Sequence, residues 1–175
     1  MRIPENYIRK ALLVCLVAVT AVFQHTSGAI PSLFGTRAML LIPLVVAIAV
    51  YERSMNGLFF GALAGILWDF ATVRGDGFFS VSLAAAGFLC GSLVTYIMRN
   101  NLATNLILSL VSTGTVNVVY WLIFIFRKGY EGSAQVLFGY YLPSVLYTMV
   151  FAFVYYYLVG FIHKATIKKK SIRHG

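Results

Sequence analysis

Short polar connectors divide this chain into long apolar segments, and this division constrains its fold more than any other feature. The connectors are Tyr51–Arg53, Arg74–Gly77, Arg99–Asn101 and Arg127–Ser133. Of the 175 residues, 60 % are hydrophobic and only 11 % are charged. A soluble domain of this length cannot bury so much apolar surface, and a transmembrane helix needs about 20 such residues. We therefore predict an all-α, polytopic membrane helical bundle that forms a single integral membrane domain over residues 1–175.

The predicted transmembrane helices number six. Their approximate ranges are 11–27, 30–50, 56–73, 78–98, 102–126 and 134–162. The second is the weakest, because its uninterrupted apolar stretch covers only Ala38–Val50, with Arg37 before it and Pro43 inside it. The connector Arg74–Gly77 has the composition of a tight turn. We therefore expect the third and fourth segments to form an antiparallel helical hairpin.

The basic residues orient these spans. The net charge is +9, and with a cytoplasmic N-terminus ten basic residues lie inside: Arg2, Arg9, Lys10, Arg53, Arg99, Lys164, Lys168, Lys169, Lys170 and Arg173. Four lie outside: Arg37, Arg74, Arg127 and Lys128. Ten against four obeys the positive-inside rule, so we predict that both termini are cytoplasmic. The run Lys168–Lys170 is either a solvated tail or a contact for anionic membrane lipid, and no nucleic-acid partner is predicted.

The third segment carries the most informative motif. Gly57, Gly61, Gly65 and Asp69 are each four residues apart, so they lie on one side of a helix. Each is turned by about 40° around the helix axis from the one before it. Small residues at this spacing allow another helix backbone to approach closely. Three interpretations are open: packing within this chain, an interface with a different protein, or a ligand groove.

Asp69 is the acidic residue that lies inside a predicted span. A charge at the centre of a span costs roughly 2.5–3.5 kcal/mol, so we expect Asp69 to face a polar partner. The candidate partners are Arg37, Arg74 and the hydroxyls of Ser80 and Ser82. The alternative is a cap that only orders the hairpin turn.

Two further segments carry patterns that suit helix packing. In the fourth segment and the turn before it, small residues recur at Gly77, Gly87 and Gly91, and we expect this side to pack against the third segment. The fifth segment carries a polar stripe, Asn105, Ser109, Thr113 and Asn117. This stripe predicts interhelical hydrogen bonds, or alternatively a solute cavity.

Enzyme signatures are absent from the sequence. It contains no nucleophile with a placed base, no phosphate-binding glycine loop beside a lysine and no cluster of metal ligands. We therefore predict a protein that is not an enzyme, with no catalytic residue, no cofactor and no metal site.

The third and fourth segments resemble a known family. The run from Gly57 through Gly61 and Gly65 to Asp69, followed by a short turn, Gly77 and a helix of small residues, resembles the bacterial rod-shape-determining protein MreD family. The chain length, the six spans with short loops and the basic ends are also similar to that family. The weak second span, with Arg37 and Pro43, departs from the expected pattern.

This resemblance implies a role. MreD-like proteins lie in the cytoplasmic membrane of rod-shaped bacteria as non-catalytic scaffolds of the elongation machinery that makes lateral peptidoglycan. The resemblance implies an MreC-like bitopic membrane protein as direct partner. Through it, the implied partners are a RodA-type glycosyltransferase, a class B penicillin-binding protein and an actin-like filament.

The same resemblance supplies an alternative. The six-helix fold of MreD-like proteins is similar to the substrate-binding component of energy-coupling-factor transporters. The alternative function is therefore the substrate-binding membrane component of a vitamin or metal-ion importer. Such a protein needs a polar and aromatic pocket at the outer face, to which Trp68 and Asp69 could contribute.

Overall fold

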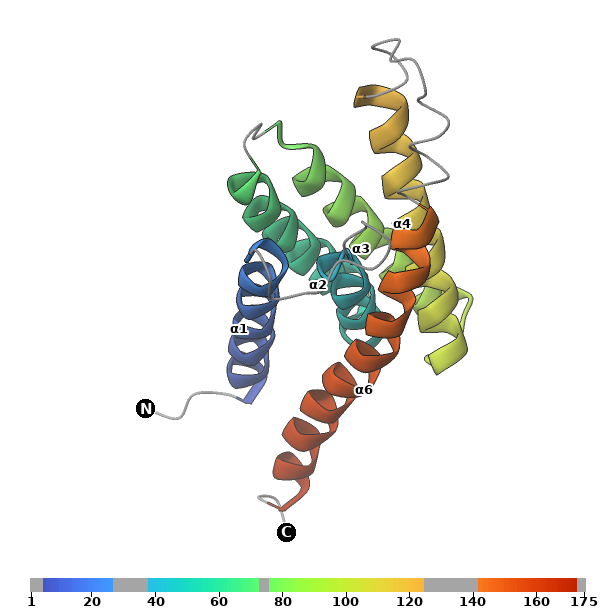
Figure 1. The fold of residues 1–175 in the computed structure, drawn as a ribbon. Helices are drawn as coiled ribbons and strands as arrows, with labels where there is room; N and C mark the ends of the chain where they lie inside the picture. Colours follow the sequence, from blue (N-terminus) through green and yellow to red (C-terminus); the bar gives the residue numbers. More distant parts are fainter. Residues whose placement is uncertain (1–4, 27–37, 73–75, 125–141, 173–175) are drawn as a thin grey trace.

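The computed structural model describes residues 5–26, 38–72, 76–124 and 142–172, and every structural statement below concerns these residues. They form five α-helices and no strand: α1 (Glu5–His25), α2 (Leu41–Ala71), α3 (Phe78–Tyr96), α4 (Leu102–Phe124) and α6 (Leu142–Ile172) (Figure 1). All five are long and apolar enough to cross a membrane. The predicted class, an all-helical multi-pass membrane protein, is confirmed.

The number of helices differs from the six that we predicted. The second and third predicted spans form one element, α2, which breaks at Arg53, where φ is 71° and ψ is 179°. Along a straight helix, residues 49 and 57 would lie about 12 Å apart. Here a Cβ added to Gly57 would lie 2.8 Å from the Cβ of Ala49, so the two arms of α2 fold back against each other. One residue with a positive φ and an extended ψ replaces the predicted loop at Tyr51–Arg53.

The first arm of α2 is an interior helix. Every residue from Leu41 to Val50 is buried, and the arm has about 18 Å of length against a hydrocarbon core of about 30 Å. The free amides at its start are paired by neighbouring helices: Leu41 N–H donates to Gln24 Oε1 at 2.9 Å, and Met39 N–H donates to Thr148 Oγ1 at 3.1 Å. Such an irregular helix start is tolerated at membrane depth because protein surrounds it. A helix that lies inside the bundle does not need to span the whole hydrocarbon core, and this explains why the second apolar segment is short.

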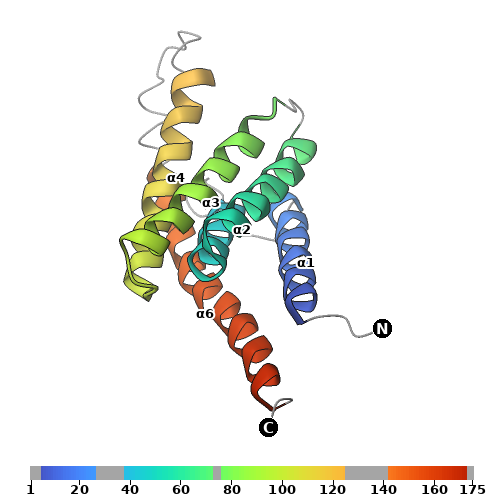
Figure 2. The same ribbon diagram turned by 180° about the vertical axis from the view of Figure 1, so that it is seen from behind.

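The other helices enclose this arm. The second arm of α2 runs beside α3, and both views show the pair lying next to each other (Figures 1 and 2). Side chains from all the helices meet around the first arm, including Val17 of α1, Leu83 of α3, Val116 of α4 and Val159 of α6. The start of α1 and the end of α6 lie at the same end of the bundle (Figure 1). We refer to this end as the terminal end and to the other as the hairpin end.

Most predicted boundaries agree with the helices. The range 78–98 corresponds to α3, 102–126 to α4, and 11–27 to α1, which begins earlier, at Glu5. The range 134–162 corresponds to α6, which continues to Ile172. Arg37, Arg74, the connector Arg127–Ser133 and residues 134–141 lie outside the described residues.

Candidate functional site

The glycines of the predicted motif face the backbone of α3. A Cβ added to Gly57 would overlap the carbonyl oxygen of Gly87, and one added to Gly61 would overlap the carbonyl oxygen of Leu83. The third glycine, Gly65, meets the carbonyl oxygen of Phe79 in the same way. Backbones this close leave no room for a side chain on the glycine. Of the three interpretations of the motif, packing within the chain is the one that the structure shows.

The small residues of α3 complete this contact. Gly87 lies against the carbonyl oxygen of Gly57, and a Cβ on Gly91 would lie 2.6 Å from the Cα of Ser54. We call the set Gly57, Gly61, Gly65, Gly87 and Gly91 the glycine seam. Gly77 is separate from it: it precedes α3 with φ of 70°, and an added Cβ there would meet no atom within 4 Å. Its role is the left-handed turn, which glycine adopts without strain.

Asp69 closes the hairpin end of the glycine seam. Its carboxylate accepts hydrogen bonds from the backbone N–H of Phe79 (3.2 Å), from the backbone N–H of Ser80 (2.8 Å) and from the Ser80 hydroxyl. Those amides are in the first turn of α3, where helix N–H groups have no partner within the helix. Gly77 at the N-cap position has no side chain to supply one, so α2 caps α3.

The structure shows which of two predicted partners, Ser80 or Ser82, binds Asp69. Ser80 is confirmed as a partner of Asp69, whereas Ser82 lines a different groove of the bundle. Arg37 and Arg74 lie outside the described residues. The negative carboxylate also lies at the positive end of the α3 dipole, which is a favourable position for a negative charge.

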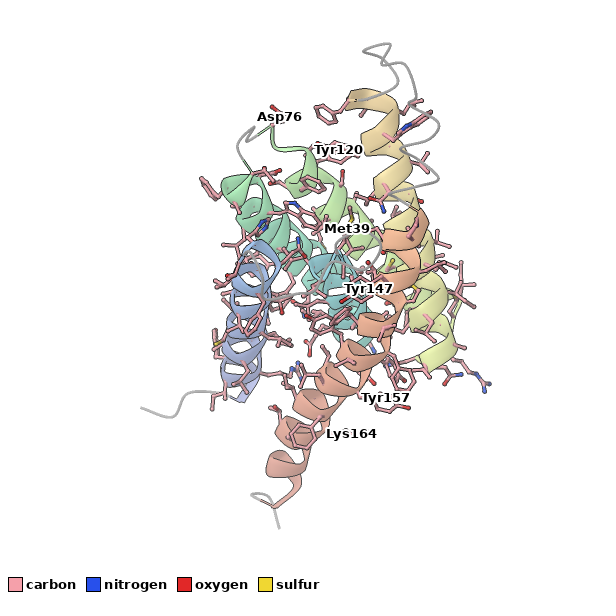
Figure 3. The ribbon with its side chains drawn as sticks, viewed as in Figure 1. Met39, Asp76, Tyr120, Tyr147, Tyr157 and Lys164 are labelled. Carbon is pink, nitrogen blue, oxygen red and sulfur yellow. The ribbon has the colours of Figure 1, made fainter. Side chains whose placement is uncertain are left out.

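Aromatic side chains surround the capped end of α3. Trp68 stacks on Phe79 with ring centroids 4.2 Å apart, and Phe79 stacks on Tyr120 of α4 at 5.6 Å. His25 of α1 meets the edge of Trp68. Figure 3 shows Asp76 and Tyr120 at this same hairpin end. A small pocket of about 70 Å³ lies here, lined by Asp69, Thr72, Asp76, Phe78, Phe79, Tyr120 and Phe124. We call it the hairpin pocket.

A second polar cluster, which we did not predict, lies toward the terminal end. Glu52, at the break of α2, has a side chain only 3 % exposed. Its Oε1 lies 2.7 Å from Arg9 Nε of α1, and its Oε2 accepts a hydrogen bond from Arg9 Nη2 at 3.0 Å. His163 Nδ1 of α6 lies 3.3 Å from Oε1, and the Asn56 amide donates to the Glu52 carbonyl at 3.2 Å. Glu52 therefore links α1, α2 and α6.

The sequence offered one signal for this cluster. Glu52 is a lone acid in a short connector on the side that carries the predicted basic excess, where Arg9 and His163 also lie. We interpreted it as a loop residue, because a polar triplet between two apolar runs normally marks a connector. Its burial follows from the fold-back of α2 at Arg53, which local sequence does not reveal.

The polar stripe of α4 faces the interior. Asn105, Ser109 and Thr113 are 0 % exposed, and Asn117 is 2 % exposed. The Asn105 amide donates to the carbonyl oxygen of Ala152 of α6 at 3.2 Å, so one predicted interhelical hydrogen bond is confirmed. Within the described part of the chain, Ser109 Oγ, Thr113 Oγ1 and Asn117 Nδ2 have no hydrogen-bond partner.

The carboxylates of these clusters are already engaged. Asp69 accepts three hydrogen bonds from α3, and Glu52 is paired with Arg9. No group of three or more His, Cys, Asp or Glu side chains that could hold a metal ion is found in the described ranges. What the two clusters do is join helices: α2 to α3 at the hairpin end, and α1, α2 and α6 toward the terminal end. Comparisons with protein-family models, with curated proteins and with solved structures gave no match to this chain.

Proposed function

We propose that this protein is a non-catalytic integral membrane scaffold of the MreD type, which binds an MreC-like bitopic partner and supports lateral peptidoglycan synthesis. The proposal rests on the role of the glycine and aspartate motif, which is the part of the sequence that resembles the MreD family. Gly57, Gly61, Gly65 and Asp69 all hold α2 against α3, and the Asp69 carboxylate is occupied by hydrogen bonds from Phe79 and Ser80. A motif devoted to a rigid helix pair suits a scaffold.

The proposed membrane orientation places both termini in the bacterial cytoplasm. In this orientation the short first arm of α2 carries the chain back through the interior of the bundle and the second arm returns it, so the five described helices change sides six times. The contacts that support it are Gln24 beside Leu41 toward one face, and Arg9 beside Glu52 toward the other. The basic excess of ten against four supports the cytoplasmic assignment of the terminal end.

The partner helix in this proposal does not use the glycine seam. That surface is filled by α3, so an MreC-like helix must meet another face of the bundle. Large apolar side chains are exposed on every helix, as expected of surfaces that meet lipid or a second membrane protein.

One observation favours the alternative, a substrate-binding component of a vitamin or metal-ion importer. The hairpin pocket combines carboxylates with aromatic rings at the end of the bundle that is proposed to face outward. However, its volume of about 70 Å³ is far below the roughly 300–1,000 Å³ typical of small-molecule sites. The scaffold remains the better supported function.

Depletion of the protein in its rod-shaped host tests the proposal. The expected result is rounded cells, together with recovery of an MreC-like protein when the tagged chain is purified from membranes. Unchanged rods that require an added vitamin would contradict the scaffold and support the importer. Gly114→Ala provides a matched tagged control, because an added Cβ at that helix position meets no atom within 4 Å.

A further inference from the structure

Arg53, at the break of α2, has a backbone conformation that suits glycine. Its φ of 71° and ψ of 179° lie in a region that a residue with a Cβ adopts only with strain, whereas glycine adopts it freely. Of the described residues other than glycine, only Arg53 has a positive φ. The break is held in place by α3, because a Cβ added to Gly91 would lie 2.6 Å from the Cα of Ser54. The backbone of this site therefore does not explain why the residue is an arginine.

Packing of the bundle does not explain the arginine either. Arg53 is exposed, and its side chain makes no hydrogen bond or ion pair with the described residues. The adjacent acid is engaged elsewhere, since Glu52 is buried and paired with Arg9. Within the part of the chain that the structure describes, Arg53 is therefore a positive charge without a partner, at the turn between the two arms of α2.

The distribution of basic residues in the sequence gives this charge a specific importance. Arg37 precedes the first arm of α2 and Arg74 follows the second, and both belong to the side that is proposed to face outward. Between Lys10 and Arg99, Arg53 is the only basic residue assigned to the cytoplasmic side. Basic residues near the ends of a span are retained on that side. Without Arg53, the basic residues that flank the two arms would all lie outside, which favours the opposite orientation of α2.

We propose that Arg53 is a topological signal, whose charge retains the break of α2 on the cytoplasmic side while the chain inserts into the membrane. The strained backbone is the cost of placing a charge at this turn. The first arm makes such a signal necessary, because Leu41–Val50 is far shorter than the roughly 20 residues of an ordinary span. The proposal rests on the proposed orientation of the bundle and does not depend on the proposed role in cell elongation.

Cysteine labelling of the full chain measures on which side of the membrane the break lies. The reporter is Met55→Cys, because Met55 is two residues beyond Arg53 and 74 % exposed. The native cysteines, Cys15 and Cys90, are replaced by alanine in every variant. With Arg53 present, a membrane-impermeant maleimide should label the reporter only after the membrane is opened.

The charge of residue 53 should decide the labelling. Arg53→Ala should raise the fraction labelled in intact cells by about fivefold or more, because the membrane potential acts on each charge with at least this effect. Arg53→Lys should leave the labelled fraction unchanged, since it keeps the charge.

Two further variants separate the charge from backbone strain and from ligand binding. Arg53→Gly removes both charge and strain, so it should misorient like Arg53→Ala, yet its correctly inserted chains should need more SDS to unfold. Replacing Arg37 and Arg74 by glutamine in the Arg53→Ala chain should return the break to the cytoplasmic side. In that chain no basic residue flanks α2, so the basic ends of the chain set the orientation. Binding of a ligand to the guanidinium group would not be restored in this way.

Three results would overturn the proposal. They are a cytoplasmic break in Arg53→Ala, labelling of Arg53→Lys in intact cells at the level of Arg53→Ala, or no restoration when Arg37 and Arg74 are replaced. Loss of a co-purified membrane protein from a correctly oriented Arg53→Ala chain would identify Arg53 as a partner contact instead. If Arg53→Ala does not accumulate in the membrane, recovery of its amount by the changes at Arg37 and Arg74 supports the proposal, and continued loss overturns it.

Discussion

The carboxylate of Asp69, near the end of α2, accepts the backbone N–H of Ser80, in the first turn of α3, at 2.8 Å. One helix thus supplies the cap that the next helix lacks, because the residue before α3 is Gly77. The cap lies one helical turn beyond Gly65, so it continues the glycine seam to the hairpin end. The spacing of four residues throughout the motif keeps the cap on the same side of α2 as the glycines.

Substitutions of Asp69 should separate its capping role from its charge. Asp69→Asn keeps one acceptor oxygen and should lower the free energy of unfolding by about 1 kcal/mol. Asp69→Leu leaves two amides and the Ser80 hydroxyl without partners, and should cost about 2–3 kcal/mol. Unfolding by SDS in mixed micelles measures both. Equal losses for the two variants would contradict the capping role.

The glycine seam should not accept even a methyl group. Gly61→Ala places a Cβ against the carbonyl oxygen of Leu83, so the backbones must separate, at a cost of about 1–3 kcal/mol. Gly114→Ala is the matched control, since its Cβ enters open space and alanine favours the helix. The same SDS unfolding assay compares them. A Gly61→Ala variant as stable as Gly114→Ala would refute the close contact.

The Glu52 cluster should behave as a buried ion pair. Removing Glu52 leaves Arg9 without its partner, and removing Arg9 leaves Glu52 with only His163 and Asn56 beside it, so Arg9→Ala and Glu52→Ala should each lower stability by about 3 kcal/mol. The double variant should lose much less than the sum of the two, which a double-mutant cycle measures. Lys10→Ala, next to Arg9 but exposed, is the control and should change little. Additive losses would exclude direct coupling.

Two positions of the polar stripe should respond in opposite ways. Asn105→Leu removes the hydrogen bond to Ala152 and should destabilise the bundle by about 0.6 kcal/mol or more. Thr113→Val removes a buried hydroxyl that has no partner among the described residues, so it should be neutral or stabilising. Thermal unfolding in detergent distinguishes the two. Marked destabilisation by Thr113→Val would reveal a bound water or a further partner.

The proposed orientation is open to a labelling test. Asp76→Cys should react with a membrane-impermeant maleimide in intact cells, whereas Ser171→Cys should react only after the membrane is opened. The native cysteines provide the background, because Cys15 and Cys90 both lie within helices that are long and apolar enough to span a membrane. Labelling of Ser171→Cys in intact cells would reverse the orientation.

The sequence by itself determined the helical membrane class and most helix boundaries. Both follow from local properties: the length of each apolar run and the polar residues between runs. Packing of the glycine motif within the chain was one of three interpretations that the sequence left open, and Ser80 was one of four candidate partners of Asp69. The reason is that α2 and α3 are neighbours joined by a tight turn, so their contacts involve residues close in sequence.

Only the tertiary structure decided how the first arm of α2 is placed. Its fold-back at Arg53 turns a weak predicted span into an interior helix and moves Glu52 from a connector into a buried cluster. The partners of that cluster, Arg9 and His163, are 43 and 111 residues away in the sequence. Such pairings depend on how whole helices pack against each other. In a membrane, lipid is as apolar as a protein interior, so the apolar pattern of a helix does not show which of its faces is buried.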